Sequence, residues 1–224
     1  VGTSGPIHQL TGFTPTTLQG ELVTNKGSSN VRPVISDNQI VWGSNKSYRV
    51  LGAAFDDRRG GLLPEDLTLL ADHVFTGQNK LTQLALQEEP WSLVWGVRED
   101  GLLWSCTYDR DQGVRAWAQH KIGGTHSVNG LVSGSSASVE ITRDHASVKS
   151  ICTIPSTDER FQELWMVVER HAVQADGAPT SVDKIYRSIE VMTRRFELDD
   201  RDEDAYYVDC GIAAQDIPVD GNGD

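Results

Sequence analysis

Two stretches of this chain superimpose on each other without a gap at an offset of 53 residues. Residues 40–56 and residues 93–109 both begin with an apolar pair and Trp-Gly, and both end in an aromatic residue followed by Asp. In each stretch a polar turn separates two apolar runs, which is the pattern of two antiparallel strands joined by a turn. A repeat of this length, built from strand-turn-strand units, is typical of β-propeller blades or of another β-array.

A partial third copy lies downstream. Residues 163–168 resemble the first half of the unit, and residues 185–192 resemble its second half. Trp165 follows Trp95 by 70 residues, which is 17 more than the first interval. The excess lies in residues 123–146, which are rich in Gly and Ser. We expect this segment to be an excursion from the blade, as a loop or an extra hairpin, whose deletion leaves the domain folded.

Short runs of aromatic and β-branched residues predict strands along most of the chain. Only residues 64–75 are typical of a helix, because Pro64 stands at the start, acids fill the first turn and apolar residues recur at helical spacing. The sequence therefore predicts an all-β fold of propeller-like blades with one short helix. The predicted strands cover residues 18–24, 30–35, 39–43, 48–55, 81–87, 92–98, 102–108, 114–120, 137–142, 148–154, 163–170 and 184–192.

The number of blades in the sequence is too small for a closed propeller. Two complete blades and part of a third fall short of the roughly four to eight that closure requires, and open blades leave unpaired sheet edges. We therefore expect the chain to be part of a larger polypeptide, or its edges to be covered by neighbouring chains. On this basis residues 1–212 form the propeller-like domain, and residues 213–224 begin a further segment or linker.

The tryptophans divide into two predicted groups. Trp42 and Trp95 are aligned by the repeat, so we expect them at equivalent buried positions on equivalent strands of two successive blades. Trp104, Trp117 and Trp165 also lie in strand-like runs and are predicted to be core residues. Trp91, beside Pro90, is the candidate for an exposed aromatic side chain.

The charge of the chain constrains its partners. A net charge of −12 and a pI near 4.9 argue against a basic groove for nucleic acid, because phosphate neutralisation needs clustered Lys and Arg. The acidic run at residues 197–204 is predicted to be a solvated loop. No apolar run approaches the roughly 20 residues of a membrane span, so we expect none.

Residues that carry catalysis or bind metals lack the spacing that such chemistry needs. The six histidines, His8, His73, His120, His126, His145 and His171, form no HExxH or His-x-His motif and no Cys-paired spacing. Ser133, in Gly-Leu-Val-Ser-Gly, is not in a nucleophile elbow. Of three cysteines, Cys106 and Cys152 lie in strand-like runs and are predicted to be small buried hydrophobic residues, and Cys210 completes an odd number.

Acidic motifs leave two alternatives open. Residues 109–113 begin like a calcium loop, but His120 stands where a bidentate Glu is required, so a hairpin turn is the better interpretation. Residues 220–224 space oxygen ligands by two. Glu88, Glu89, Asp100, Glu163 and Glu169 are the candidates for the acid pair of a glycosidase. We nevertheless predict no enzymatic activity, no catalytic, cofactor-binding or metal-binding residues, and no cofactor.

An ordered series of motifs resembles the tail nozzle proteins of short-tailed bacteriophages, the tail tubular protein B-like group. The resemblance covers about residues 11 to 212, and residues 123–146 are longer than the group leads us to expect. The motifs are residues 14–16, 66–75, 87–101, 107–117, 148–155, 163–170, 188–192 and 205–211.

The resemblance implies a non-enzymatic virion protein that assembles as a homo-oligomer, usually a sixfold ring, at the distal tail. Neighbouring tail adaptor and fibre proteins would be its partners, and genomic DNA would pass through the lumen during ejection. An acidic lumen suits such transit, since it repels phosphate. The alternative is a carbohydrate-binding or glycan-degrading β-propeller that recognises host surface sugars, for which exposed aromatic side chains on loops would be the signature.

Overall fold

The structure, a computed structural model, describes residues 4–36, 39–58, 60–76, 79–110, 112–131, 138–157, 161–172 and 184–192. Within these residues the chain forms fifteen strands and no helix, so the fold is all-β. Consequently none of the described segments offers a helix of the length and apolarity needed to cross a membrane. Residues 197–204, Cys210 and residues 213–224 lie outside the described residues.

The strands form three larger antiparallel sheets and two hairpins. The first sheet contains β3 (Val34–Ser36), β4 (Gln39–Gly43), β5 (Val50–Asp56) and β6 (Gly61–Asp66) in that spatial order. The second sheet contains β7 (Leu81–Gln87), β8 (Leu93–Arg98), β9 (Leu103–Asp109) and β10 (Val114–His120). The third sheet contains β13 (Ser147–Pro155), β14 (Gln162–Ala172) and β15 (Lys184–Val191). The hairpins are β1 (Ile7–Thr11) with β2 (Gln19–Thr24), and β11 (His126–Leu131) with β12 (Ser138–Arg143).

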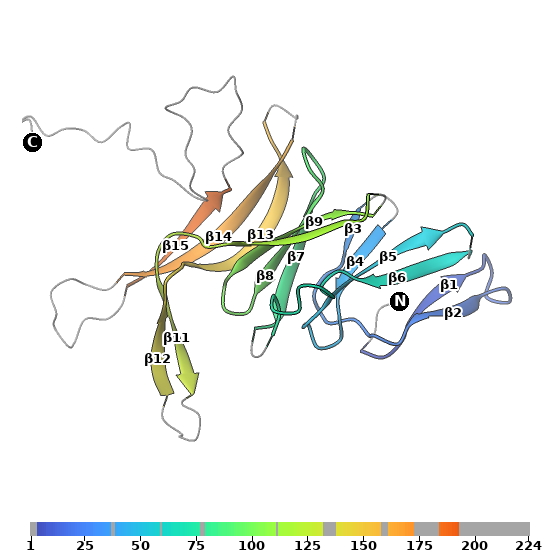
Figure 1. The fold of residues 1–224 in the computed structure, drawn as a ribbon, viewed down its shortest axis with the longest axis horizontal. Coiled ribbons are helices and arrows are strands. Elements are labelled where there is room, and N and C mark those ends of the chain that lie inside the picture. The colour runs from blue at the N-terminus through green and yellow to red at the C-terminus, as the bar shows by residue number, and fades with distance from the viewer. Residues whose placement is uncertain are drawn as a thin grey trace, which may run out of the picture.

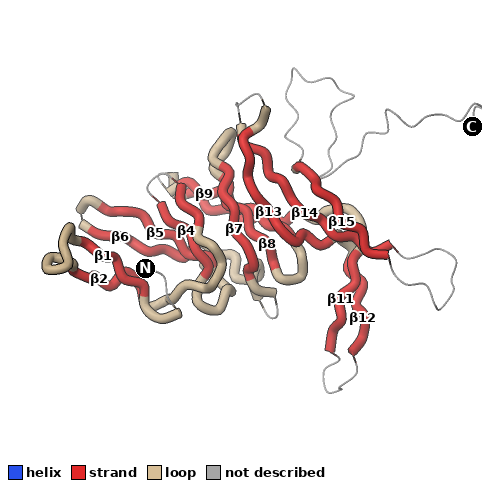
Figure 2. Tube along the Cα trace, turned by 180° about the vertical axis from the view of Figure 1, so that it is seen from behind, coloured by secondary structure: helices blue, strands red, loops and turns tan. Residues whose placement is uncertain are grey.

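The three sheets stand in a row, with the β1–β2 hairpin beyond the first sheet (Figure 1). The same row is seen from behind in Figure 2, where β11 and β12 project away from it. Because each sheet runs straight from strand to neighbouring strand, every blade-sized unit of the sequence becomes one antiparallel meander. The coarse prediction of an all-β chain of successive antiparallel sheets is therefore confirmed.

Three apolar layers hold the row together. The hairpin layer lies between the β1–β2 hairpin and the first sheet, layer 1–2 between the first and second sheets, and layer 2–3 between the second and third sheets. The hairpin layer contains Trp42, Leu51 and Ala53 with Ile7, Ile40 and Leu62 against them. Layer 1–2 contains Val31, Val41, Val50, Leu67, Val74, Phe75, Leu81, Leu84, Val94, Leu102, Trp104, Cys106 and Tyr108. Layer 2–3 contains Ala85, Trp95, Val97, Leu103, Ile122, Ala146, Val148, Ile151, Leu164, Met166 and Val168.

The aligned tryptophans occupy the same strand of their sheets but not the same layer. Trp42 and Trp95 both lie on the second strand, and 5% and 4% of their surfaces are exposed, which confirms the predicted strand and burial. Trp42, however, packs in the hairpin layer and Trp95 in layer 2–3, whereas their neighbours Val41 and Val94 share layer 1–2. Equivalent positions of successive propeller blades point the same way around the ring. The first and second sheets instead turn equivalent faces toward each other.

The second sheet also contains one extra residue that the ungapped superposition conceals. Trp42 pairs with Leu51, 9 residues on, whereas Trp95 pairs with Ser105, 10 residues on. Since successive strand residues point to opposite faces, this single residue changes which side chains of β9 meet the first sheet. Tyr108 is therefore buried in layer 1–2, while the residue aligned with it, Phe55, is 39% exposed on the opposite side of its sheet.

Gly43 and Gly96, the glycines of the two Trp-Gly pairs, are required for the same structural reason. Both face the side chain of Leu81, which begins β7 and is 2% exposed. A Cβ atom on Gly43 would lie 3.0 Å from Leu81 Cδ2, and one on Gly96 would lie 3.2 Å from Leu81 Cδ1. Glycine at both positions thus lets two sheets close on one leucine.

Gly43→Ala is expected to destabilise the fold by about 1–3 kcal/mol, the usual cost of an extra methyl group in a packed layer. Besides Leu81, the new methyl group would meet the hydroxyl of Ser29 at 2.8 Å. The matched control is Gly123→Ala, whose Cβ would have nothing within 4 Å and whose backbone is not left-handed. Urea unfolding of both variants measures the difference, and equal stability of the two would mean that the close approach at Gly43 is not a constraint.

The helix predicted for residues 64–75 is wrong. Pro64 lies in β6, an edge strand that tolerates the missing N–H, and the chain after β6 forms successive turns. Asp66 Oδ1 accepts hydrogen bonds from the backbone N–H and the hydroxyl of Thr68 at 3.1 and 2.8 Å. This local pairing competes with helical hydrogen bonding and starts a turn. Leu70, on the apolar face of the predicted helix, is 96% exposed.

The segment predicted as an excursion, residues 123–146, contains the β11–β12 hairpin. The hairpin leaves the row from a base that is part of the core. Ile122 and Ala146 are both 1% exposed in layer 2–3, and the Ala146 N–H donates to the Ile122 carbonyl oxygen at 2.9 Å. Deletion of residues 123–146, which the sequence predicts to leave the domain folded, would also remove Ala146 from this base, and its outcome stays a prediction.

Candidate functional site

The acidic motifs occupy structural positions. Asp109 Oδ1 accepts the backbone N–H of Gln112 at 2.9 Å, so the calcium-like motif forms the turn between β9 and β10, as expected. Residues 220–224 lie outside the described residues. Within the described part of the chain, no group of three or more His, Cys, Asp or Glu side chains is arranged to hold a metal ion.

Two of the five candidate glycosidase acids are committed to cations. Burial raises the pKa of Asp100, but the hydrogen bonds and charge of Arg98 outweigh it and hold the pKa below its ordinary value. Burial likewise raises the pKa of Glu169, but the hydrogen bonds and charges of Lys149 and Arg187 outweigh it and hold this pKa below its usual range. A carboxyl group with a lowered pKa stays ionised and is a poor proton donor.

The other three acids lie at one end of the second and third sheets. The Glu89 carbonyl oxygen accepts the backbone N–H of Gln162 at 3.1 Å, which brings the turn after β7 beside the start of β14. Glu88 and Glu89 are exposed in this turn, and Glu163 accepts the Trp165 indole N–H at 3.0 Å.

The tryptophans outside the repeat largely follow the predicted division. Trp104 is buried, and Trp117 packs against layer 1–2 with its indole N–H 2.9 Å from the Leu67 carbonyl oxygen. Trp165 is half-buried on the outer face of the third sheet. Trp91 is 51% exposed, as expected for a surface aromatic residue.

The cysteines differ from each other. Cys106 is fully buried, and burial raises the pKa of its thiol to about 12, which makes it unreactive. Cys152 is exposed, so its prediction as a buried residue is wrong. It lies opposite Trp165 in the β13–β14 ladder and shares its outward face, which a strand-like sequence run cannot reveal.

Sequence spacing gave no indication of a histidine cluster where the β11–β12 hairpin leaves the row. The rings of His145 and His171 lie 4.9 and 6.5 Å from that of His126, centroid to centroid. His126 is 2% exposed, and its Nδ1–H donates to the His145 carbonyl oxygen at 2.7 Å. Its Nε2 has no hydrogen-bond partner among the described residues. His171 Nδ1 accepts the backbone N–H of Ser127 at 3.0 Å, so both hydrogen bonds hold the start of β11.

Stability should fall in acid because of His126. Burial lowers the pKa of His126, and the charges of Lys149 and His171 act in the same direction. The folded state thus favours the neutral ring, so this contribution to stability is complete above the ordinary value of 6.5 and is lost as pH falls through the lowered folded pKa. We expect His126→Gln, which keeps a donor for the His145 carbonyl, to flatten the decline in unfolding free energy between about pH 7 and about pH 5.

The control for this experiment is His8→Gln, at an exposed position on β1. The free energy of urea unfolding is measured at several pH values for the three proteins. A decline that is as steep in His126→Gln as in the parent chain would assign the acid sensitivity to other groups.

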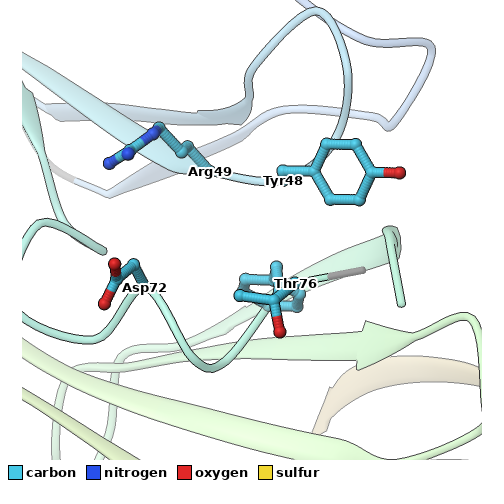
Figure 3. A pocket seen from close by; sticks show the side chains of 5 residues that line it. Tyr48, Arg49, Asp72 and Thr76 are labelled. Atoms are coloured by element: carbon cyan, nitrogen blue, oxygen red, sulfur yellow. The ribbon is translucent and has the colours of Figure 1, made fainter. Parts of the chain in front are cut away.

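Two hollows meet at Tyr48. The Arg49 hollow, of about 410 Å³, lies between the β4–β5 turn and the turns after β6. Arg49 lies across from Asp72 there, and Tyr48 lies across from Thr76 (Figure 3). Arg49 binds Asp66 at 3.0 Å. The Tyr48 hollow, of about 520 Å³, shares the Tyr48 side chain with the Arg49 hollow. It is lined by Ser29, Asn30, Asn45, Lys46, Ser47, Tyr48 and Lys80.

Backbone hydrogen bonds fix the shape of the Tyr48 hollow. The Ser44 N–H donates to the Arg49 carbonyl oxygen at 2.8 Å, which closes the β4–β5 turn. Ser47 has a left-handed backbone (φ 60°), and its carbonyl oxygen accepts the Leu81 N–H at 2.8 Å. The turn that carries Lys46 is therefore tied to the start of β7, next to Lys80.

The outer face of the third sheet is an apolar surface that no described residue covers. Residues that alternate along β14 and β15 point away from layer 2–3 and form cross-strand pairs: Val167 with Ile189, and Trp165 with Val191. Ile189 is 72% exposed. Beside these pairs, Glu169 binds Arg187 at 2.8 Å and Lys149 at 3.0 Å, and these charges border the apolar surface.

A second apolar surface lies at the opposite end of the row. Gln9 faces the first sheet, where its Oε1 accepts the Leu62 N–H at 3.1 Å. Leu10 and Leu22 lie on the other side of the β1–β2 hairpin, where 50% and 51% of their surfaces are exposed. Both ends of the row therefore present apolar side chains to their surroundings.

No protein-family model matches this chain, and no curated protein matches it in sequence. The assignment of a function therefore depends on the motifs of the sequence and on the surfaces described above.

Proposed function

We propose that this chain is a non-enzymatic structural protein of a virion, a subunit of the ring that forms the tail nozzle of a short-tailed bacteriophage. The observation that carries the proposal is the apolar outer face of the third sheet, which no described residue covers. The ordered series of motifs that resembles nozzle proteins supports it. In this role the ring is the conduit through which DNA enters the host, beside tail adaptor and fibre proteins.

The outer face suits another protein because the other faces of the three described sheets are covered. Both faces of the first and second sheets, and the inner face of the third, pack in apolar layers. The pair of Val167 and Ile189 would form the centre of a further layer of the same kind. Burying apolar surface contributes roughly 25 cal/mol per Å², so an open sheet face of this kind favours association.

The second apolar surface, on the β1–β2 hairpin, indicates what packs on the outer face of the third sheet. If the β1–β2 hairpin of one subunit covers the third sheet of the next, Leu10 and Leu22 meet Val167 and Ile189. This contact joins two different surfaces, so it is head-to-tail, and head-to-tail contacts close into rings when the rotation between subunits permits. Adjacent subunits would then continue the row of stacked sheets, which replaces the blades that one chain lacks.

The electrostatics suit a conduit for DNA. The net charge is −12, and many of the basic side chains are already paired with carboxylates. A basic side chain that is paired in this way is less available to neutralise phosphate. Together with the negative net charge, this favours DNA contact that is weak and independent of sequence. The pairs are Lys26 and Arg49 with Asp66, Arg98 with Asp100, Arg115 with Glu65, Lys121 with Asp144, Lys149 and Arg187 with Glu169, and Arg170 with Glu190.

Assembly in solution tests the proposal. We expect the parent protein to sediment as a closed homo-oligomer, six subunits being the number that the resemblance implies. The same sample should retain neither single-stranded nor double-stranded DNA at physiological salt. A monomer at every concentration, or tight DNA binding, would contradict the proposal.

A further inference from the structure

We propose that the Tyr48 hollow is a binding site for an acidic sugar, one whose ring carries a carboxylate. This inference goes beyond the structural role proposed above and does not depend on it. The site combines, in one hollow, an aromatic ring with two cations and several hydrogen-bonding groups that have no ion-pair or hydrogen-bond partner among the described residues.

The cations of the hollow are unpaired. Neither Lys46 nor Lys80 forms an ion pair with any residue that the structure describes. The Lys80 ammonium group lies over the Tyr48 ring, 5.9 Å from its centre, and both residues line the hollow. None of the lining residues is acidic, although the chain as a whole has a net charge of −12. A hollow of this composition favours an anion, since no carboxylate of its own competes for the ammonium groups.

The uncharged groups suit the hydroxyls of a sugar. The side-chain amide of Asn30 and the hydroxyls of Ser47 and Tyr48 make no hydrogen bond to any described residue. Together they offer both donors and acceptors, which is what a ring bearing several hydroxyl groups requires. Asn45 is partly engaged, since its amide donates to the Ser4 carbonyl oxygen at 2.6 Å.

Size and rigidity add to this argument. A volume of about 520 Å³ falls within the roughly 300–1,000 Å³ of ordinary ligand pockets. The turn that carries Ser47 and Tyr48 is fixed by its own hydrogen bonds and by Leu81. A fixed site loses little conformational entropy on binding, which improves the affinity for a small ligand.

The surroundings disfavour a nucleic-acid strand. A strand needs a continuous basic track with stacking platforms, whereas here two lysines stand in one isolated hollow. A nucleic-acid strand that continued into the adjoining Arg49 hollow would meet the carboxylate of Asp72. Arg49 in that hollow is already paired with Asp66. A compact monosaccharide or oligosaccharide with one acidic ring at the hollow avoids that repulsion.

Calorimetric titration of the full chain with trigalacturonic acid tests the site. The neutral galactose trimer and a short single-stranded DNA serve as comparison ligands. We expect the acidic trimer to bind, and the neutral trimer and the DNA to bind about tenfold more weakly or not at all. In the double variant Lys46→Gln/Lys80→Gln, affinity for the acidic trimer should fall about tenfold or more.

The matched control is Arg58→Gln, which removes one positive charge at an exposed position beyond the opposite end of β5. It should leave the affinity unchanged within about twofold. Thermal unfolding verifies that the variants fold. No heat with trigalacturonic acid, an equal loss in the Arg58 variant, or tighter binding of DNA through the same lysines would each overturn the assignment. None of these results bears on whether the subunits form a ring.

Discussion

Leu81→Ala should lower the free energy of unfolding by about 3 kcal/mol, within the usual 2–5 kcal/mol for a buried leucine. Leu81 is 2% exposed, and its two terminal methyl groups face Gly43 and Gly96 on neighbouring sheets. Truncation therefore leaves a cavity lined partly by glycine backbone, which has no side chain to fill it. Urea unfolding followed by tryptophan fluorescence measures the change.

Two comparisons test whether the loss of stability comes from the close approach of Leu81 to Gly43. Leu70→Ala removes the same atoms at a position that is 96% exposed, so it should change stability by less than about 0.5 kcal/mol. Gly43→Ala should be less destabilising in the Leu81→Ala background than in the parent chain, because its methyl group then enters the cavity. A coupling of at least about 0.5 kcal/mol is expected. Simple additivity would show that the two residues do not share a contact.

Ile189→Glu should abolish assembly without unfolding the chain. Ile189 is 72% exposed in the single chain, so the charge is tolerated there, but in the proposed ring it would be buried without a partner. A central interface residue of this kind is worth about 2 kcal/mol or more, which weakens each contact roughly thirtyfold. Because a closed ring repeats the contact at every subunit, the loss recurs around the ring.

Leu70→Glu is the matched control, since it places the same charge on an exposed residue away from both ends of the row. Analytical ultracentrifugation gives the mass of each variant, and circular dichroism verifies the β fold. If Ile189→Glu assembles as well as Leu70→Glu, the outer face of the third sheet is not the contact between subunits.

Strand positions were the most predictable part of the fold. The predicted runs at residues 39–43, 81–87 and 114–120 coincide with β4, β7 and β10 in both bounds. One of the exceptions has a local cause. β6 was assigned to the predicted helix because its apolar spacing is helical, although the Asp66–Thr68 turn prevents a helix. β1 and β11 were not predicted at all, although their hairpin partners β2 and β12 were.

The repeat predicted the order of the strands but not the sheet face on which each side chain lies. One extra residue between Trp95 and its partner Ser105 reverses the faces of β9 relative to the alignment. The face on which a side chain lies depends on how neighbouring strands pair. An ungapped comparison of two short stretches carries no information about that pairing.

The candidate sites depend on contacts between distant parts of the chain. His126, His145 and His171 come together only because the β11–β12 hairpin returns to its starting point beside β14. The Tyr48 hollow similarly joins residues near 30, 46 and 80, and no spacing rule connects them. Sequence patterns identify sites made of residues close along the chain, and neither of these is such a site.

The proposed ring is tested most directly by cryo-electron microscopy of the phage particle to which we assign this chain. We expect a closed ring of identical subunits on the DNA axis at the distal end of the tail. In that ring the β1–β2 hairpin of each subunit should cover the outer face of the next subunit's third sheet. A single copy away from the axis, or a copy on the outside of the particle whose third sheet faces solvent, would contradict it.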